Sequence, residues 1–479
     1  MTRMNSSRRH FLHSAAALAT AGSAIGQRLS LPLAMQLAGI SSLAGLAAPA
    51  AAADTNGYKA LVCLFMHGGN DSHNWVVPVD PGGYAEYARA RGSLALPQAG
   101  LQPITSGNQG SGRAFGMPAE LAPLRELYEA GRAAIVANVG TLLRPMTKAE
   151  FLAGVGVPPR LFSHNDQQSA WQSLMPEGAA NGWGGRMGDI LAASNANPIF
   201  TAVSANGNAV FLSGTGVVQY QVNAEGPVGV GALAKSRVHG SSSGADILRG
   251  LIADAGSNPF QAEHTRIVQR AIQAEALLKS ALATVNVPAL PATVLPLPSG
   301  STTMDKEPLA RQLRMVAQLI GAQQALGMRR QVFMVGLGGF DTHANQLRDQ
   351  ACLMPRVASS VRWFHDTMAA MGLGGNVTLF TASDFGRTLS SNGEGSDHGW
   401  GSHQFVVGPA LRGREVHGRI PITALGTSDE VGSGRLLPTT SVTQLAAALG
   451  AWMGLEPAEL AWALPELRHF GSAPRLQSA

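Results

Sequence analysis

The sequence predicts an α/β fold, in which helices cover both faces of a mostly parallel central sheet. Short apolar runs alternate along the chain with segments of helical periodicity, a pattern that is typical of βαβ units. The 479 residues are 45% hydrophobic and only 14% charged. This composition supports a large core and argues against coiled coils and helical repeats, which need abundant charge.

Six apolar runs have the length and composition of buried strands. They are 60–66, 133–139, 198–203, 331–337, 377–382 and 405–407. Helical patterns alternate with them at 119–130, 167–174, 186–193, 261–282, 309–326, 347–371 and 440–453.

Two further stretches interrupt this alternation. Residues 222–245 are rich in Gly, Ser and Val, and we interpret them as an irregular insertion. Residues 287–303 are rich in Pro and predict a semi-rigid connector.

The first 53 residues predict an export signal. Arg8 and Arg9 precede Phe11 and an apolar stretch of Ala, Gly and Ser, which ends in three alanines at 51–53. This pattern resembles a twin-arginine signal peptide with a small-residue cleavage site. We therefore expect recognition by the twin-arginine (Tat) export machinery and a periplasmic or secreted product.

The mature chain would then be residues 54–479, predicted to form a single domain with no stable membrane span after cleavage. The alternative to a cleaved signal peptide is a membrane anchor over residues 29–50. Pro32, Pro49 and the many small residues make this stretch a poor bilayer helix.

Charge and cysteine content exclude several functions. The net charge is +5, but residues 1–53 hold four arginines and no acidic residue, which leaves +1 for the remainder. A nearly neutral body gives no electrostatic basis for nucleic-acid binding. Cys63 lies inside an apolar run and Cys352 in a predicted helix. We expect both to be buried free thiols, and the alternative is a disulfide formed outside the cytoplasm. The absence of Cys-x-x-Cys excludes zinc ribbons and thioredoxin chemistry.

Three predicted strands run directly into Gly-rich turns that carry an acidic residue. The acids are Asp71, Asp341 and Asp384. Because the carboxyl ends of parallel strands meet at one edge of a sheet, we expect these turns to face one crevice. A fourth turn, Asp397–His403, precedes the last predicted strand and contributes further ligand-type side chains.

Carboxylates gathered in one crevice repel one another unless a metal, a basic residue or protonation compensates them. His343, His398 and His403 add imidazoles to this set. Mixed Asp and His ligands suit zinc, manganese or iron, whereas carboxylates with few histidines suit magnesium or calcium. The sequence therefore predicts a divalent metal ion without selecting which one.

A polar cluster, Ser163-His164-Asn165-Asp166, opens the helix predicted at 167–174. A helix start favours anions, and a metal could activate the Ser163 hydroxyl as a nucleophile, with His164 as an alternative site residue. The other interpretation is a helix cap at Ser163 or Asp166 beside an exposed His164. Arg387 could hold an oxyanion bidentately or pair with a local carboxylate.

Several motifs together resemble the bacterial domain-of-unknown-function family 1501. They are HGGNDSHN (67–74), LFSHNDQQSAWQ (161–172), GWGGRMGD (182–189), GGFDTH (338–343), SDFGRT (383–388) and DHGWGSH (397–403). That family resembles the alkaline phosphatase and sulfatase superfamily. The resemblance implies a three-layer sandwich, one or two divalent metals, and a nucleophile at a helix start that attacks a phosphate or sulfate ester of a small molecule or glycan.

By the same resemblance, Asp71 and Asp384 would hold one metal. Asp341 and His343, with either His398 or His403, would hold another.

The chain departs from the superfamily at two points. Asp384 is followed by Phe385 instead of the usual His, and the sulfatase pattern Cys/Ser-x-Pro-x-Arg is absent. These departures keep open an alternative function, in which a non-catalytic exported protein uses the same scaffold to bind a metal, a glycan or a protein partner.

Overall fold

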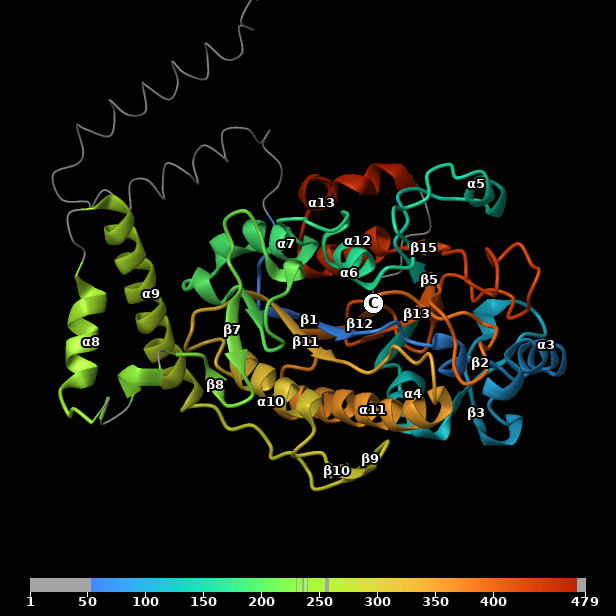
Figure 1. Ribbon diagram of the computed structural model, residues 1–479, viewed down its shortest axis with the longest axis horizontal. Helices are drawn as coiled ribbons and strands as arrows, with labels where there is room; N and C mark the ends of the chain where they lie inside the picture. The colour runs from blue at the N-terminus through green and yellow to red at the C-terminus, as the bar shows by residue number, and fades with distance from the viewer. Residues whose placement is uncertain (1–52, 230, 235–236, 239, 255–257, 472–479) are drawn as a thin grey trace, which may run out of the picture. The chain divides into compact units, whose positions relative to one another are not determined.

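A ten-stranded mixed sheet lies at the centre of the computed structural model (Figure 1). The structure describes residues 53–229, 231–234, 237–238, 240–254 and 258–471. The predicted signal peptide, except Ala53, and the alternative anchor lie outside the described residues.

The strand order is β14-β5-β13-β12-β1-β11-β6-β7-β8, and β15 also pairs with β5. The strands are β1 Lys59–Met66, β5 Ala133–Gly140, β6 Ala202–Ser204, β7 Tyr220–Asn223, β8 Gly226–Pro227, β11 Arg330–Leu337, β12 Val377–Ser383, β13 Ser402–Val407, β14 Val416–His417 and β15 Thr440–Ser441.

The central strands run parallel. β1 pairs in parallel with both β11 and β12, and β6 pairs in parallel with β11. β13 is antiparallel to both of its neighbours, β12 and β5. The predicted α/β class with a mostly parallel sheet is therefore confirmed, with β13 as an antiparallel exception inside it.

Helices cover both faces of this sheet (Figure 1). Along β1, Val62 and Leu64 belong to one apolar core, whereas Leu61, Cys63 and Phe65 belong to a second. This alternation follows from the two-residue side-chain period of a strand, and a strand buried on both faces reads as a continuous apolar run.

The first core packs against α4 Ala122–Glu129, α10 Pro308–Gly321 and α11 Gln346–Ala370. The second core packs against α7 Trp183–Leu191 and α12 Val442–Met453. The other helices are α3 Pro81–Arg91, α5 Lys148–Leu152, α6 His164–Ser173, α8 Gly244–Ala253, α9 Pro259–Leu282 and α13 Pro457–Ala463. Among the residues that the structure describes, no helix is both long and apolar enough to cross a bilayer.

Two segments differ from the sequence-based expectation. Within 287–303, β9 Val294–Leu297 and β10 Gly300–Thr303 form an antiparallel hairpin instead of a simple connector. Gly300 has φ +128°, which favours glycine at this turn. Residues 198–203 begin as a 3-10 turn over Pro198–Phe200, because Pro198 has no N–H for a strand ladder.

A three-stranded sheet, β2 Val77–Pro78, β3 Leu101–Ile104 and β4 Phe115–Pro118, was not predicted, and neither was α3. These strands are short and contain Pro and Gly, so they lack the apolar runs that mark the main sheet.

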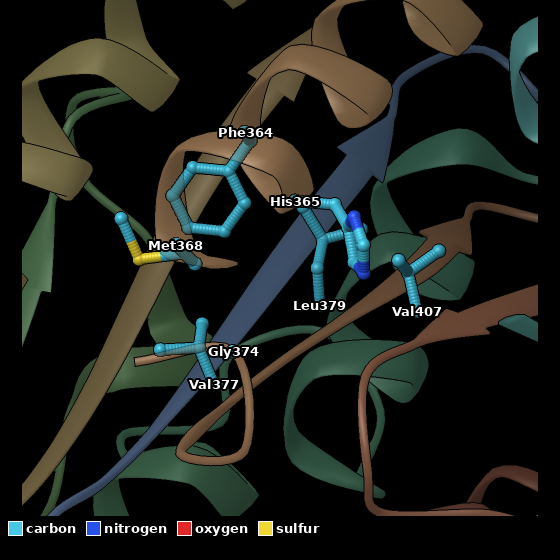
Figure 2. Close-up of a pocket in the computed structure, with 7 residues that line it drawn as sticks. All are labelled: Phe364, His365, Met368, Gly374, Val377, Leu379 and Val407. Carbon is cyan, nitrogen blue, oxygen red and sulfur yellow. The ribbon is translucent and has the colours of Figure 1, made fainter. Parts of the chain in front are cut away.

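A small pocket borders the first core. Figure 2 shows its lining, which includes Phe364 and Met368 of α11 and Val377 at the start of β12. Its volume is about 10 Å³, which is about enough for one water molecule. Cys63 and Cys352 are buried and unpaired.

Candidate metal centre at the carboxyl edge of the sheet

The turns that follow β1, β11 and β12 meet at one edge, because these strands are parallel neighbours. Gly68 joins the three turns. It has φ +117°, and a Cβ on it would lie 2.3 Å from the Asp341 nitrogen. Its own N–H donates to Asp384 Oδ1 at 3.1 Å. Only glycine lets the β1 turn approach the other two this closely.

His164, Asp341 and His398 converge at this edge, and we call them the His–Asp cluster. One ligand-type atom from each lies within 4.8 Å of the others. His164 Nε2 is 3.4 Å from Asp341 Oδ2, and His398 Nε2 is 3.3 Å from Asp341 Oδ1. The three residues come from the start of α6, the turn after β11 and the turn before β13.

A further group orients each imidazole of the His–Asp cluster from behind. His164 Nδ1 is 2.6 Å from Asp384 Oδ2, and Gln168 donates to the same oxygen at 2.9 Å. His398 Nδ1 is 2.7 Å from the Phe162 carbonyl oxygen. Because carboxylate and carbonyl oxygens accept, we assign the proton of each neutral imidazole to Nδ1. Both Nε2 atoms then direct lone pairs toward Asp341, as in metal-binding histidines.

The carboxylate of the cluster is oriented in the same way. Arg387 Nη1 donates to Asp341 Oδ1 at 2.7 Å. Burial acts to raise the pKa of Asp341, but the hydrogen bond and charge of Arg387 outweigh it and hold this pKa below its ordinary value. Asp341 is therefore ionised at neutral pH.

The two imidazoles differ electrostatically. The hydrogen bond to Asp384 raises the pKa of His164, whereas burial lowers the pKa of His398. His398 is consequently neutral at neutral pH, which is the protonation state that a metal requires.

The Phe385 ring packs against the imidazoles of both His164 and His398. Its ring centroid is 4.9 Å from that of His164 and 4.5 Å from that of His398. Gly69 makes room for the ring, since a Cβ there would lie 2.5 Å from it. The residue that departs from the superfamily pattern thus packs against the two histidine rings.

His343 lies at the outer side of the cluster. Its Nε2 is 2.9 Å from His398 Nε2 and 3.1 Å from Asp341 Oδ1. Its Nδ1 is 3.4 Å from Asp397 Oδ1. His343 therefore contacts two members of the cluster without belonging to the group of three that converges.

Asp71 is not a member of the His–Asp cluster, and its pairing with Asp384 on one metal stays a prediction. Its carboxylate is fully buried and forms an ion pair with the equally buried Arg91. Gln346 donates to the same carboxylate oxygen at 2.6 Å. A guanidinium from α3 therefore supplies the counter-charge that the sequence suggested a metal would supply.

Of the two predicted alternatives, His398 belongs to the cluster and His403 does not. His403 is buried in β13, and its Nδ1 accepts a hydrogen bond of 3.0 Å from the Asn138 N–H. Burial lowers the pKa of His403 to about 3, so this imidazole is neutral.

The predicted catalytic residues take three different positions. His164 is in the cluster. Arg387 is fully buried behind Asp341 and also donates to the Gly68 carbonyl at 3.2 Å, so it does not face a substrate oxyanion. Ser163 is the half-buried N-cap residue of α6, but its hydroxyl makes no capping hydrogen bond.

Sequence reasoning missed several supporting groups. Gln168 lies four residues after His164, so helical spacing could have placed the two side chains on one face of α6. Asp397 directly precedes His398 in the quoted motif. Neither Arg91 nor the Phe162 carbonyl carries a signal in the sequence, because each reaches its partner only through tertiary packing.

Comparison with known proteins gives one clear match. The model of the family described as "Protein of unknown function (DUF1501)" matches residues 58–468. No curated protein matches the chain.

Among solved structures, the chain is similar to Ps i-CgsB in complex with k-i-k-neocarrahexaose, with 11% identity, 87% of this chain and 77% of that chain covered, and a TM-score of 0.32. It is also similar to BT1596, a 2-O GAG sulfatase, with 12% identity, coverage of 85% and 73%, and a TM-score of 0.31. For PsFucS1 sulfatase from Pseudoalteromonas sp., the identity is 11%, the coverage 88% and 73%, and the TM-score 0.32. Likenesses this weak transfer neither fold nor function to this chain.

Proposed function

The chain belongs to the DUF1501 family, which confirms the family resemblance, and we propose that it is an exported metal-dependent hydrolase of phosphate or sulfate esters. The observation that carries the proposal is the His–Asp cluster, in which three ligand-type side chains converge and each is oriented by a second group. His164 forms a hydrogen bond with Asp384, and His398 forms one with the Phe162 carbonyl. Asp341 accepts a hydrogen bond from Arg387. Hydrogen bonds that orient the ligand side chains in this way are typical of functional metal sites.

The residues fit a divalent metal by their donor chemistry. His164 and His398 would offer Nε2 lone pairs and Asp341 a carboxylate oxygen, with His343 as a further donor. Mixed imidazole and carboxylate donors suit zinc, manganese or iron better than magnesium or calcium. These residues would hold the metal, which would supply Lewis-acid chemistry toward an ester oxygen.

The chain's own residues would bind and orient the ester. Asp341 is 46% exposed and His398 21% exposed, so a substrate can reach the cluster from solvent. The N-terminus of the ten-residue helix α6 favours an anionic group at the same place. Ser163 places its uncapped hydroxyl at this helix start, and we propose it as the nucleophile. Its oxygen would bond to phosphorus or sulfur while the bond to the leaving alcohol breaks and the hydroxyl proton passes to solvent, and water would then hydrolyse the covalent ester to release phosphate or sulfate.

Metal content and turnover test this function together. We expect purified protein loaded with zinc or manganese to hold stoichiometric metal and to hydrolyse an aryl phosphate or an aryl sulfate. His164→Ala should abolish both properties, whereas His469→Ala, a matched change of an exposed histidine, should preserve them. Wild-type protein that binds no divalent metal and turns over neither ester would instead support the non-catalytic binding alternative.

The export proposal has an independent test. Replacing Arg8 and Arg9 together with Lys should leave an uncleaved precursor in the cytoplasm, because the twin-arginine pathway reads this pair. Cleavage after Ala53 would place the new terminus at Asp54, whose N–H donates to the Gly454 carbonyl at 2.9 Å. Fractionation and N-terminal sequencing provide the readout, and normal periplasmic accumulation of the double variant would exclude this route.

A further inference from the structure

We propose that Arg435, stacked on the Phe162 ring, binds the tetrahedral oxyanion of the substrate beside the His–Asp cluster. This inference rests on the proposed function, because it names the group that holds the charged end of a phosphate or sulfate ester. Arg387 does not fill this role, because its guanidinium is fully buried behind Asp341.

Arg435 is fixed beside the cluster by contacts with two residues. Its Nε donates to the His398 carbonyl at 2.9 Å, and its guanidinium carbon lies 4.8 Å from the centroid of the Phe162 ring. The Phe162 carbonyl in turn receives the His398 Nδ1 proton at 2.7 Å. The three residues thus form a closed set of contacts, one member of which belongs to the cluster. A guanidinium held in this way loses little conformational freedom when it binds an anion.

One end of this guanidinium is free to bind. Nη1 makes a long 3.4 Å contact with the Gly432 carbonyl, and Nη2 has no hydrogen-bond partner among the described residues. The side chain is partly exposed. Arginine donors suit phosphate and sulfate oxygens, because their hydrogen bonds to anions are charge-assisted and directional.

Its guanidinium also forms no direct ion pair among the described residues, unlike two other arginines of the chain, and the Asp397 carboxylate interacts with its charge only at longer range. Arg160 lies 3.7 Å from Asp166 and 3.9 Å from Glu177, and Arg144 lies 2.9 Å from Glu150. Within the described part of the chain, Arg435 has no carboxylate within 4.0 Å. An unpaired cation fixed next to a metal-type site is the arrangement that an anionic substrate would complete.

Anion binding tests the inference without requiring turnover. We would measure inorganic phosphate and inorganic sulfate by calorimetry on metal-loaded protein. The variants are Arg435→Gln, Arg435→Lys and a control, Arg270→Gln, which removes an exposed guanidinium on α9. Arg435→Gln should weaken the better-bound anion about 10–100-fold, the range for a lost charge-assisted hydrogen bond. Arg435→Lys should recover part of this loss, and Arg270→Gln should match wild type.

A merely structural role would show itself in different measurements. If Arg435 only supports His398, Arg435→Gln should lose metal and thermal stability while any protein that remains loaded binds anions normally, and this result would overturn the inference. Unchanged anion affinity in Arg435→Gln would also overturn it, as would a wild-type protein that binds neither anion. In kinetics, Arg435→Gln should raise KM for the ester more than it lowers kcat.

The inference and the proposed function fail separately. Wild-type protein that binds an anion through Arg435 but hydrolyses no ester would refute the hydrolase function and support the anion site. Ester turnover that Arg435→Gln leaves unchanged would support the hydrolase function and refute the anion site.

Discussion

Two acidic turns at the same edge of the sheet have opposite surroundings. Asp71, after β1, is fully buried and forms an ion pair with Arg91, which is equally buried. Asp341, after β11, is 46% exposed and contacts His164 and His398. Both acids follow a buried strand and a Gly-rich turn, so the local sequence describes them alike. Each carboxylate pairs with a buried arginine, Arg91 for Asp71 and Arg387 for Asp341. The difference therefore teaches that exposure and neighbouring imidazoles distinguish the two turns: Asp71 is fully buried, whereas Asp341 is open to solvent beside two histidines.

Breaking the buried Asp71–Arg91 ion pair should have the largest effect on the free energy of unfolding. Arg91→Leu removes the counter-charge of Asp71 and should lower the free energy of unfolding by about 3–5 kcal/mol, because an uncompensated buried charge remains. The loss should be the same in chelator and in metal, as measured by denaturant unfolding.

The matched double variant, Asp71→Asn with Arg91→Leu, should recover part of that stability, because it removes both charges. A loss of metal affinity in Arg91→Leu with stability unchanged would instead place Asp71 in the metal site and remove the contrast between the two turns.

Variants of the His–Asp cluster should instead change metal affinity, and their effect on stability should depend on metal. His398→Ala removes a proposed ligand and should weaken metal binding by at least about 10–100-fold, since even the loss of a supporting group costs this much. Its melting temperature should fall in the presence of metal and change little in chelator, because only the bound state loses a partner. Equal destabilisation under both conditions would mean that the cluster is a structural ion-pair network.

The pH dependence of stability should differ between the buried His403 and the histidines of the His–Asp cluster. The pKa of His403 is about 3 in the folded protein and near 6.5 when unfolded. Between these values the unfolded chain binds the extra proton, so stability is full above pH 6.5 and falls as the pH drops toward 3.

At pH 5 the titration of His403 should lower the free energy of unfolding by about 2 kcal/mol relative to neutral pH. His403→Gln should reduce this loss of stability, as measured by denaturant unfolding at a series of pH values. The raised pKa of His164 acts with the opposite sign in metal-free protein: its contribution is present below the unfolded pKa and is lost as the pH rises through the folded value. An acid profile that His403→Gln leaves unchanged would contradict the assignment to His403.

Ser163 should show the smallest effect on stability. Because its hydroxyl makes no capping hydrogen bond, Ser163→Ala should change the free energy of unfolding by less than about 0.5 kcal/mol. Ester turnover should nevertheless disappear, with metal content unchanged. Activity that survives in Ser163→Ala would transfer the nucleophile role from Ser163 to water at the cluster.

The sequence alone determined the strands of the central sheet and the turns that follow them. Apolar runs such as 331–337 predict buried strands, because a strand that is covered on both faces does not alternate apolar with polar residues. The turns with Asp341, His343 and Asp384 were predicted to share one edge, since parallel strands present their carboxyl ends together. The hairpin at 294–303 and the sheet of β2, β3 and β4 were missed, because short strands with Pro and Gly carry little local signal.

Only the tertiary structure decided what each of these residues does. Arg91 reaches Asp71 from a helix that the sequence did not predict, and Arg387 turns inward to Asp341 instead of outward to a ligand. His398 and His403 share one motif, yet His403 points into the interior on β13 while His398 remains in the turn before it. The physical reason is that charge compensation and burial act through space, between groups that are 20 residues apart for Asp71 and Arg91 and 220 apart for His164 and Asp384, whereas a local motif specifies only the side chains that are available.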